Sequence, residues 1–235
     1  MIYFNGKTLE SVAPVRVIDI LASPIQMNAT VRTRPIRPGS DFVRMTQGTR
    51  TVSITFALLT NDMHVRQKQL MDIRQWALSS REAPLLLPNY PQMVLNCICT
   101  AMPEPSTRQW WESKLRLVFT AYDNPFFTAI NEKSASCGST AFWVGGDAPP
   151  LMRIESTLAA DTVAVFGDGT NTMTFGTYTG RPTGTLVIDL NRQTAAVGST
   201  SVMQGYTFAS RFIEPVCGSM TITGTGTVKW KERWI

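Results

Sequence analysis

The best-patterned stretch of this sequence is RTVSITFAL, residues 50–58. Within it, Val52, Ile54, Phe56 and Leu58 alternate with smaller or polar residues. Successive side chains of a β-strand point to opposite faces, so a period of two predicts a half-buried antiparallel strand. We therefore expect the first half of the chain to contain an antiparallel sheet.

A helix is predicted directly after this strand, over about residues 62–80. Asp62 supplies an N-cap, because its carboxylate can accept the first free backbone N–H groups. Apolar residues then recur at helical spacing on one face. Those residues are Leu70, Ile73 and Ala77, with Trp76 flanking them. This is the one helix that the pattern predicts.

The remaining pattern predicts short strands. In the first half they lie at about residues 85–87, 94–100 and 114–121. From residue 131 onward Gly, Thr and Ser become frequent, and turn signals such as Asp168-Gly169 separate further strands. These strands are predicted over residues 151–157, 162–166, 172–179, 185–189, 194–197, 219–223 and 227–231.

These patterns predict a mainly β protein with two domains. Residues 1–131 should form an α+β domain, a β-sandwich or barrel with one helix and a long β-hairpin arm. Residues 132–235 should form an all-β sandwich. The boundary is placed where small polar residues accumulate, near residues 131–138.

A basic segment, residues 31–51, precedes the patterned strand and is called the arm. It contains five arginines and one carboxylate, Asp41, and accounts for +4 of the formal net charge of +5. Pro35 and Pro38 interrupt it, which favours a long hairpin over a helix. Residues 131–235 are neutral overall, so the high isoelectric point describes the first half of the chain.

Clustered arginines can neutralise phosphates, but the arm does not suit nucleic acid. Between Arg32 and Arg50 its only aromatic residue is Phe42, and no recognition helix is predicted nearby. Partial alternation of apolar residues favours docking on a protein. We therefore predict a protein interface and no specific nucleic-acid binding. The predicted interface residues are Arg32, Arg34, Arg37, Phe42, Arg44, Met45 and Arg50.

The sequence offers no catalytic or cofactor-binding motif. His64 is the only histidine, and neither a nucleophile elbow, a zinc-protease motif nor a phosphate-binding loop is present. The cysteines, Cys97, Cys99, Cys137 and Cys217, lack zinc-ligand spacing and are predicted to be reduced thiols made in a cytoplasm. We expect no enzyme activity, cofactor or metal. No apolar run is long enough for membrane insertion, and no signal peptide is recognised.

Exposed aromatic residues in the second half could contact a sugar. The candidates are Trp143, Tyr178 and Tyr206. The alternative is that they are core or rim residues of a small β domain.

The order of these features resembles the distal tail protein family of long-tailed, non-contractile (siphovirus-type) bacteriophages. After the strand and helix come LLLP at residues 85–88 and FTAYDNPFF at 119–127. LVIDL at 186–190, FIEPVCGS at 212–219 and KWKERW at 229–234 follow. The sequence departs from the family pattern at Ser219, where Asn is usual, and at Trp110-Trp111, which match nothing in it.

The resemblance implies a structural virion protein, the baseplate hub ring at the distal end of the tail. It implies a homohexamer that joins the tail tube protein to the central tail-tip or fibre protein, for host attachment and DNA delivery. The arm would cross onto the neighbouring subunit. Residues 132–235 would be a galectin-like domain that carries receptor-binding proteins or touches host surface glycans. The last strand, about residues 227–235, would return to the first domain.

Two other functions remain open. The chain could be a carbohydrate-binding adhesin module of a phage tail, which glycan binding through Trp143 or Tyr178 would favour. It could also be a tail-tube ring protein, although that function does not need a Gly- and Thr-rich second domain of this size.

Overall fold

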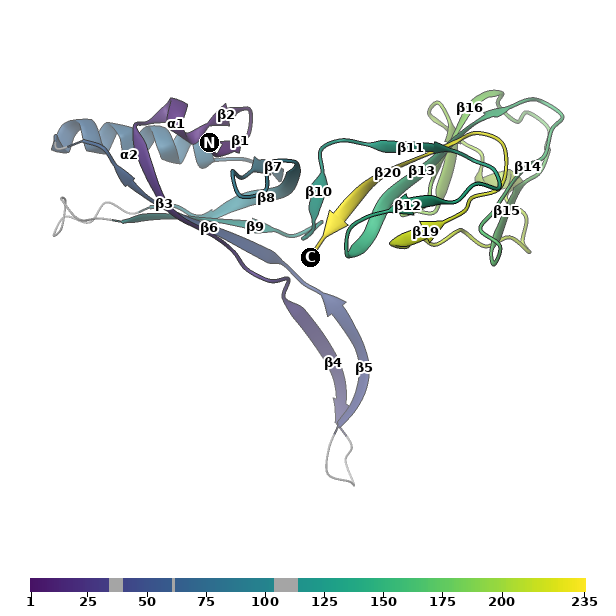
Figure 1. Ribbon diagram of the computed structural model, residues 1–235, viewed down its shortest axis with the longest axis horizontal. Helices are drawn as coiled ribbons and strands as arrows, with labels where there is room; N and C mark the ends of the chain where they lie inside the picture. Colours follow the sequence, from purple (N-terminus) through teal and green to yellow (C-terminus); the bar gives the residue numbers. More distant parts are fainter. Residues whose placement is uncertain (34–39, 61, 104–113) are drawn as a thin grey trace. The chain divides into compact units, whose positions relative to one another are not determined.

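The structure is a computed structural model that describes residues 1–33, 40–60, 62–103 and 114–235 (Figure 1). The chain forms two compact units, Met1–Phe127 together with Ile235, and Thr128–Trp234. The fold is mainly β, which confirms the predicted class. Three features discussed above, Arg34, Arg37 and Trp110-Trp111, lie outside the described residues.

The first unit is built on one antiparallel sheet. In order across the sheet, its strands are β3 (Val15–Ala22), β6 (Arg50–Leu58), β9 (Leu115–Ala121), β8 (Met93–Ala101), β7 (Ala83–Leu86), β1 (Tyr3–Phe4) and β2 (Lys7–Thr8). The strand predicted at residues 50–58 is β6, and Val52, Ile54 and Phe56 are completely buried. The alternating pattern is thus confirmed, because β6 pairs with a neighbour on both edges and buries one face.

The predicted helix is α2 (Met63–Ala77), which covers one face of this sheet (Figure 1). Asp62 caps it by accepting hydrogen bonds from the backbone N–H groups of His64 (2.8 Å) and Val65 (3.1 Å). These bonds lower the pKa of the Asp62 carboxyl below its usual value. The chain also contains a second, short helix, α1 (Leu9–Val12), which the apolar period could not reveal because it is one turn long.

Trp76 belongs to the buried face of α2 and does not merely flank it. Its ring meets Phe4 at 5.8 Å and Phe119 at 6.3 Å between centroids. The indole N–H donates a hydrogen bond to the Lys7 carbonyl (3.0 Å). These contacts connect helix, sheet and N-terminus in one core, and each burial of aromatic area of this kind stabilises the fold.

The second unit contains one sheet, one hairpin and a separate pair of strands. The sheet runs β18 (Thr200–Ser201), β17 (Thr194–Val197), β16 (Gly184–Asp189), β13 (Ala148–Leu158), β20 (Thr227–Trp234) and β11 (Lys133–Ser136). The hairpin β14 (Ala164–Gly167) and β15 (Thr172–Phe175) turns at Asp168-Gly169, as predicted. The other two-stranded element pairs β12 (Phe142–Val144) with β19 (Gly218–Met220). A short 3₁₀ helix, η1 (Met203–Gly205), completes the unit.

A single apolar core holds the second unit together, and it includes Ile154, Phe166, Phe175, Ile188 and Trp230. The strands β11 and β12 were missed from the sequence, since KSAS and FWV are too short and too mixed to show a period of two. A strand β10 (Phe127–Ala129) joins the two units along the chain. The predicted return of residues 227–235 to the first domain stays a prediction.

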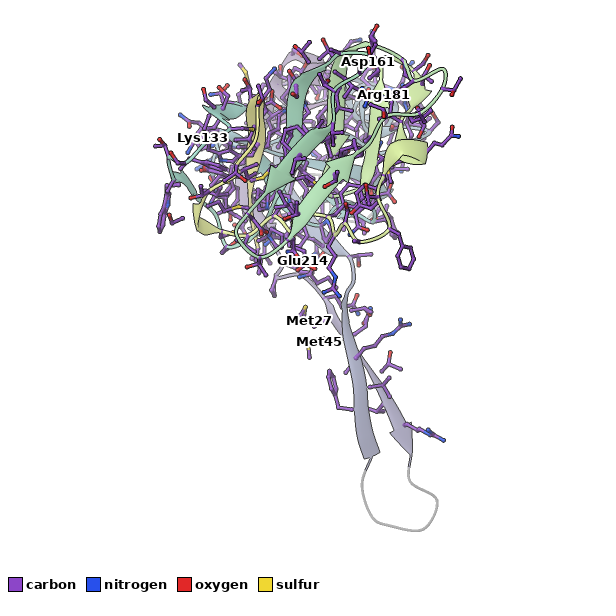
Figure 2. The ribbon with its side chains drawn as sticks, turned by 90° about the vertical axis from the view of Figure 1, so that its right-hand side faces the viewer. Met27, Met45, Lys133, Asp161, Arg181 and Glu214 are labelled. Atoms are coloured by element: carbon purple, nitrogen blue, oxygen red, sulfur yellow. The ribbon has the colours of Figure 1, made fainter. Side chains whose placement is uncertain are left out.

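Arg181 is a buried charged residue that joins two loops of the second unit (Figure 2). Its guanidinium donates hydrogen bonds to four backbone carbonyls, three of them in residues 159–162 and the fourth at Gly176 (3.1 Å). Such bonds replace the water that the guanidinium loses on burial.

Glu232 is a buried carboxylate on the closing strand β20. It accepts hydrogen bonds from Lys133 Nζ (2.6 Å) and from the Gly145 backbone N–H (2.8 Å). A Cβ at position 145 would lie 2.8 Å from Glu232 Oε1, so glycine permits this approach. Burial alone would raise the pKa of Glu232, but the bonds from Lys133 and Gly145 outweigh it and hold the pKa below its usual value.

This lowered pKa predicts a pH dependence. The stability that Glu232 contributes is present above its ordinary value of about 4.5 and is lost as the pH falls through the lower pKa of the folded state. Glu232→Gln should reduce the free energy of unfolding at pH 7 by roughly 1–2 kcal/mol and should lessen the loss of stability on acidification. Melting temperatures at neutral and acid pH would test this, with the exposed Asp161→Asn as control. Equal pH profiles for Glu232→Gln and the unchanged protein would contradict it.

Candidate functional site

The arm of the first unit is a hairpin of β4 (Met27–Thr33) and β5 (Ser40–Gln47) that continues from β3 and β6 (Figure 1). Within the described part of the chain, each strand pairs only with the other. A two-stranded hairpin is marginally stable in water by itself. The hairpin therefore has the character of an element that is completed by a partner surface.

The hairpin has an apolar face. Residues directly opposite one another in an antiparallel ladder project to the same side of the sheet, and the side alternates along each strand. The register pairs Ala29 with Met45 and Val31 with Phe42, and Met27 lies on the same face. Figure 2 shows Met27 and Met45 on the same side of the hairpin. We call Met27, Ala29, Val31, Phe42 and Met45 the apolar face of the hairpin.

The opposite face is polar. It carries Asn28, Thr30 and Arg32 on β4, and Thr46 and Arg44 on β5. The two described arginines of the hairpin are exposed, and they lie on the side away from the apolar face. Charge and apolar surface are therefore separated on this element, and the sequence period alone did not reveal this separation.

A β-bulge is responsible for the position of Phe42. Between Thr30 and Val31 the register shifts, so that the partner changes from Arg44 to Phe42 and Val43 is the extra residue. If the pairing were regular here, Val43 would oppose Val31 and Phe42 would lie on the polar face. The bulge thus adds an aromatic side chain to the methionine side, the kind of re-aiming for which bulges are known.

The apolar face is open to solvent in the described chain. Its four large side chains, Met27, Val31, Phe42 and Met45, are each between 52% and 62% exposed. Scattered exposed apolar residues are ordinary, whereas a contiguous row of them indicates an interaction surface. The geometry therefore favours contact through burial of this apolar face, with the arginines on the opposite face.

Arg50, one of the predicted interface residues, is buried at the base of the arm and is not part of the exposed hairpin. It lies in β6, and only 5% of its surface is exposed. Its guanidinium donates hydrogen bonds to the carbonyls of Ser23 (3.0 Å) and Pro125 (3.3 Å) and lies 4.6 Å from the centre of the Phe127 ring. These contacts hold the side chain within the first unit, and they tie the base of the arm to the sheet.

The three aromatic candidates for sugar contact do not form one site. Trp143 lies on β12, opposite Ser219, and is 68% exposed. Tyr178 is half-buried, and a Cβ built at Gly205 would lie 3.2 Å from its ring. Tyr206 is half-buried too and stacks on Phe212 at 4.9 Å between centroids. Tyr178 and Tyr206 thus lie near one another around η1.

Tyr206 and Phe212 line a cleft in the second unit that sequence reasoning did not find. Its volume is about 510 Å³, and Asn171, Gln193, Met203, Ser210, Arg211 and Glu214 complete the lining. Trp143 is not among the residues of this cleft. The lining residues are spread from position 171 to position 214 without regular spacing, so only the folded chain brings them together.

Neither the histidine nor the cysteines form a reactive centre in the described residues. His64 is exposed in the first turn of α2. All four cysteines are free, and burial raises the pKa of both Cys97 and Cys99, the latter to about 11. These two thiols are therefore protonated at neutral pH and are weak nucleophiles. No cluster of metal-binding side chains and no helix long and apolar enough to cross a bilayer occurs in the part described.

Comparison with known proteins identifies the fold. No protein-family model and no curated protein matches the sequence. The structure is similar to the Dit protein of phage SPP1, described as a paradigm of the hub adsorption apparatus in phages that infect Gram-positive bacteria. The TM-score is 0.74 at 13% sequence identity, and the match covers 100% of this chain and 98% of that chain. A chain of the phage P2 baseplate in its activated conformation matches with a TM-score of 0.43 and 10% identity, over 94% of this chain and 91% of that one.

The similarity to the SPP1 protein extends over both units. It shows that this chain has the fold of a phage tail hub protein, and it confirms at the level of the fold the resemblance to the distal tail protein family.

Proposed function

We propose that this chain is a non-enzymatic structural subunit of a phage tail, in which six copies form a hub ring at the distal end of the tail tube. The whole-length likeness to a phage hub protein supports the structural role. The observation that carries ring formation is the exposed apolar face of the β4–β5 hairpin. Its place in the virion and its contacts with the tail tube protein and the central tail-tip protein belong to the same proposal.

The hairpin would bind the neighbouring copy by burying its apolar face. An interface that joins two different surfaces of identical subunits is heterologous, and it closes into a ring when the rotation between copies permits. The hairpin supplies one of these surfaces. Arg32 and Arg44, on the other face, would remain at the rim, where charges guide association more than they add affinity.

The direct test is the mass of the purified full-length protein over a range of concentrations, by light scattering, together with electron microscopy. The expected result is a closed ring of six copies, either alone or after addition of the tail tube protein. A protein that stays monomeric at high concentration, both alone and with tail tube protein, would contradict the proposal.

The second candidate function, a carbohydrate-binding module, is favoured by one observation, the aromatic cleft at Tyr206. It is compatible with a ring, because the hairpin and the cleft belong to different units.

A further inference from the structure

The cleft at Tyr206 has polar groups that are not used within the fold. The side chains of Gln193, Arg211 and Glu214 make no hydrogen bond or ion pair with any described residue. Backbone bonds fix the segment that carries two of them, since Arg211 N donates to the Thr172 carbonyl (2.9 Å). The cleft therefore contains hydrogen-bond donors and acceptors that have no partner within the described fold, on a backbone segment that is held in place by hydrogen bonds.

A buried hydroxyl adds to this set. The phenol oxygen of Tyr206 is buried and has no hydrogen-bond partner in the described structure. Burial also raises the pKa of Tyr206, so the phenol is a neutral donor near pH 7. A buried hydroxyl without a partner destabilises a fold, and such groups are uncommon unless a ligand or water satisfies them.

A second cleft of the same unit provides the contrast. It is lined by charged residues, and several of these are paired within the fold. Arg153 pairs with Glu132 (3.0 Å) and Glu155 (2.9 Å). Asn191 accepts from Met152 N (2.7 Å) and donates to the Pro150 carbonyl (2.8 Å). Arg153 and Asn191 are thus used within the fold, whereas the side chains of Gln193, Arg211 and Glu214 in the Tyr206 cleft remain available.

The composition of the Tyr206 cleft indicates the ligand. Arg211 and Glu214 have opposite charges, so the lining is formally neutral and does not select an anion or a cation. Tyr206 and Phe212 stack with an interplanar angle of 23°, which gives the cleft an aromatic wall. An aromatic wall beside donors and acceptors of both kinds suits a molecule with apolar C–H faces and several hydroxyl groups.

We propose that the cleft formed by Gln193, Tyr206, Arg211, Phe212 and Glu214 binds a neutral saccharide. The sugar ring packs against the aromatic wall, and its hydroxyls bond to the Arg211, Glu214 and Gln193 side chains and to the Tyr206 hydroxyl. The site lies wholly in the second unit. It does not rest on ring formation, so a monomeric protein that binds sugar would refute the ring and leave the site intact.

Titration of the full-length protein with neutral sugars tests this site. The probes are glucose, galactose, mannose, rhamnose and N-acetylglucosamine, each as the methyl glycoside and as a short oligosaccharide, with sialic acid as the charged comparison. The expected result is saturable binding of at least one neutral sugar by calorimetry, and weaker binding of sialic acid. Absence of saturable binding for every neutral probe, or preference for sialic acid, would overturn the proposal.

Single substitutions assign the binding to the cleft. Arg211→Gln and Glu214→Gln alter exposed side chains and should each weaken binding about tenfold. The matched control is Arg192→Gln, at the other cleft, whose side chain is 84% exposed and whose ion pair with Asp189 is long at 3.9 Å; it should leave binding unchanged. Loss of binding in Trp143→Ala with none in Arg211→Gln would move the site to β12 and overturn the assignment.

Tyr206→Phe separates a binding role from a structural one. Removal of an unpartnered buried hydroxyl should raise the melting temperature of the sugar-free protein. The same change should weaken sugar binding about fivefold to tenfold, because one hydrogen bond to the ligand is lost. A stabilised variant that binds sugar as well as the unchanged protein would show that the hydroxyl has no part in the site.

Discussion

Phe42→Asp is expected to convert the ring into folded monomers. Phe42 is 62% exposed in the isolated chain, so a charge there costs the monomer little. In the assembly, the carboxylate would be buried against the apolar surface of the neighbouring copy without a partner. Aromatic residues at the centre of an interface are typical hot spots, and their loss costs about 2 kcal/mol or more, which raises a dissociation constant about 30-fold.

The loss of affinity caused by Phe42→Asp would occur at every interface of the ring. Each closed ring of six copies would contain six equivalent hairpin contacts, and all of them would carry the substitution. Light scattering at a fixed protein concentration should therefore show a change from hexamer to monomer, with unchanged far-ultraviolet circular dichroism.

The matched control is Phe208→Asp. Phe208 is fully exposed in the second unit, and the substitution introduces the same charge at a phenylalanine outside the hairpin. It should leave the hexamer intact. A hexamer that survives Phe42→Asp would remove the hairpin from the interface, and a hexamer that is lost equally in both variants would show a general charge effect.

Arg50→Met is expected to destabilise the first unit by about 3 kcal/mol. The carbonyls of Ser23 and Pro125 would lose a charged donor inside the fold, and the contact with the Phe127 ring would be lost as well. Each unsatisfied buried acceptor costs about 1–3 kcal/mol, and methionine fills part of the volume without donating a bond. Urea unfolding would measure the change.

This measurement is best made in the Phe42→Asp background, because assembly itself raises apparent stability. Arg44→Met is the control, since Arg44 is an exposed arginine on the polar face of the hairpin. It should change the free energy of unfolding by less than about 0.5 kcal/mol. Equal free energies of unfolding for the two variants would contradict the prediction, because Arg50 would then contribute no more to stability than an exposed arginine.

Much of the fold was predictable because its signals are local. The period of two at residues 50–58 and the spacing of Leu70, Ile73 and Ala77 each describe one face of one element, and burial follows from that face. The hairpin turn at Asp168-Gly169 is local as well. Strands as short as β11 and β12 carry too few residues for a period and are defined by their partners, β20 and β19.

The candidate functional surfaces were less predictable because they depend on distant residues. Arg50 looked like the last of five similar arginines, yet acceptors at Ser23 and Pro125 commit it to the core. Tyr178 and Tyr206 were candidates for sugar contact because they are aromatic, whereas no sequence motif singled out Arg211 and Glu214. Arg32 and Met45 remain predicted interface residues, and Arg34 and Arg37 lie outside the described residues.

The sequence by itself determined the strands with a clear period of two, such as β6, where α2 begins, and that a basic hairpin precedes β6. These follow from periodicity, capping and turn chemistry, which act between near neighbours in the chain. Only the tertiary structure decided which side chains are exposed on a surface and which are bonded inside the fold. A bulge of one residue brings Phe42 to the side of Met45, and long-range hydrogen bonds withdraw Arg50 from the surface. Register and burial depend on partners far along the chain, and no local pattern encodes them.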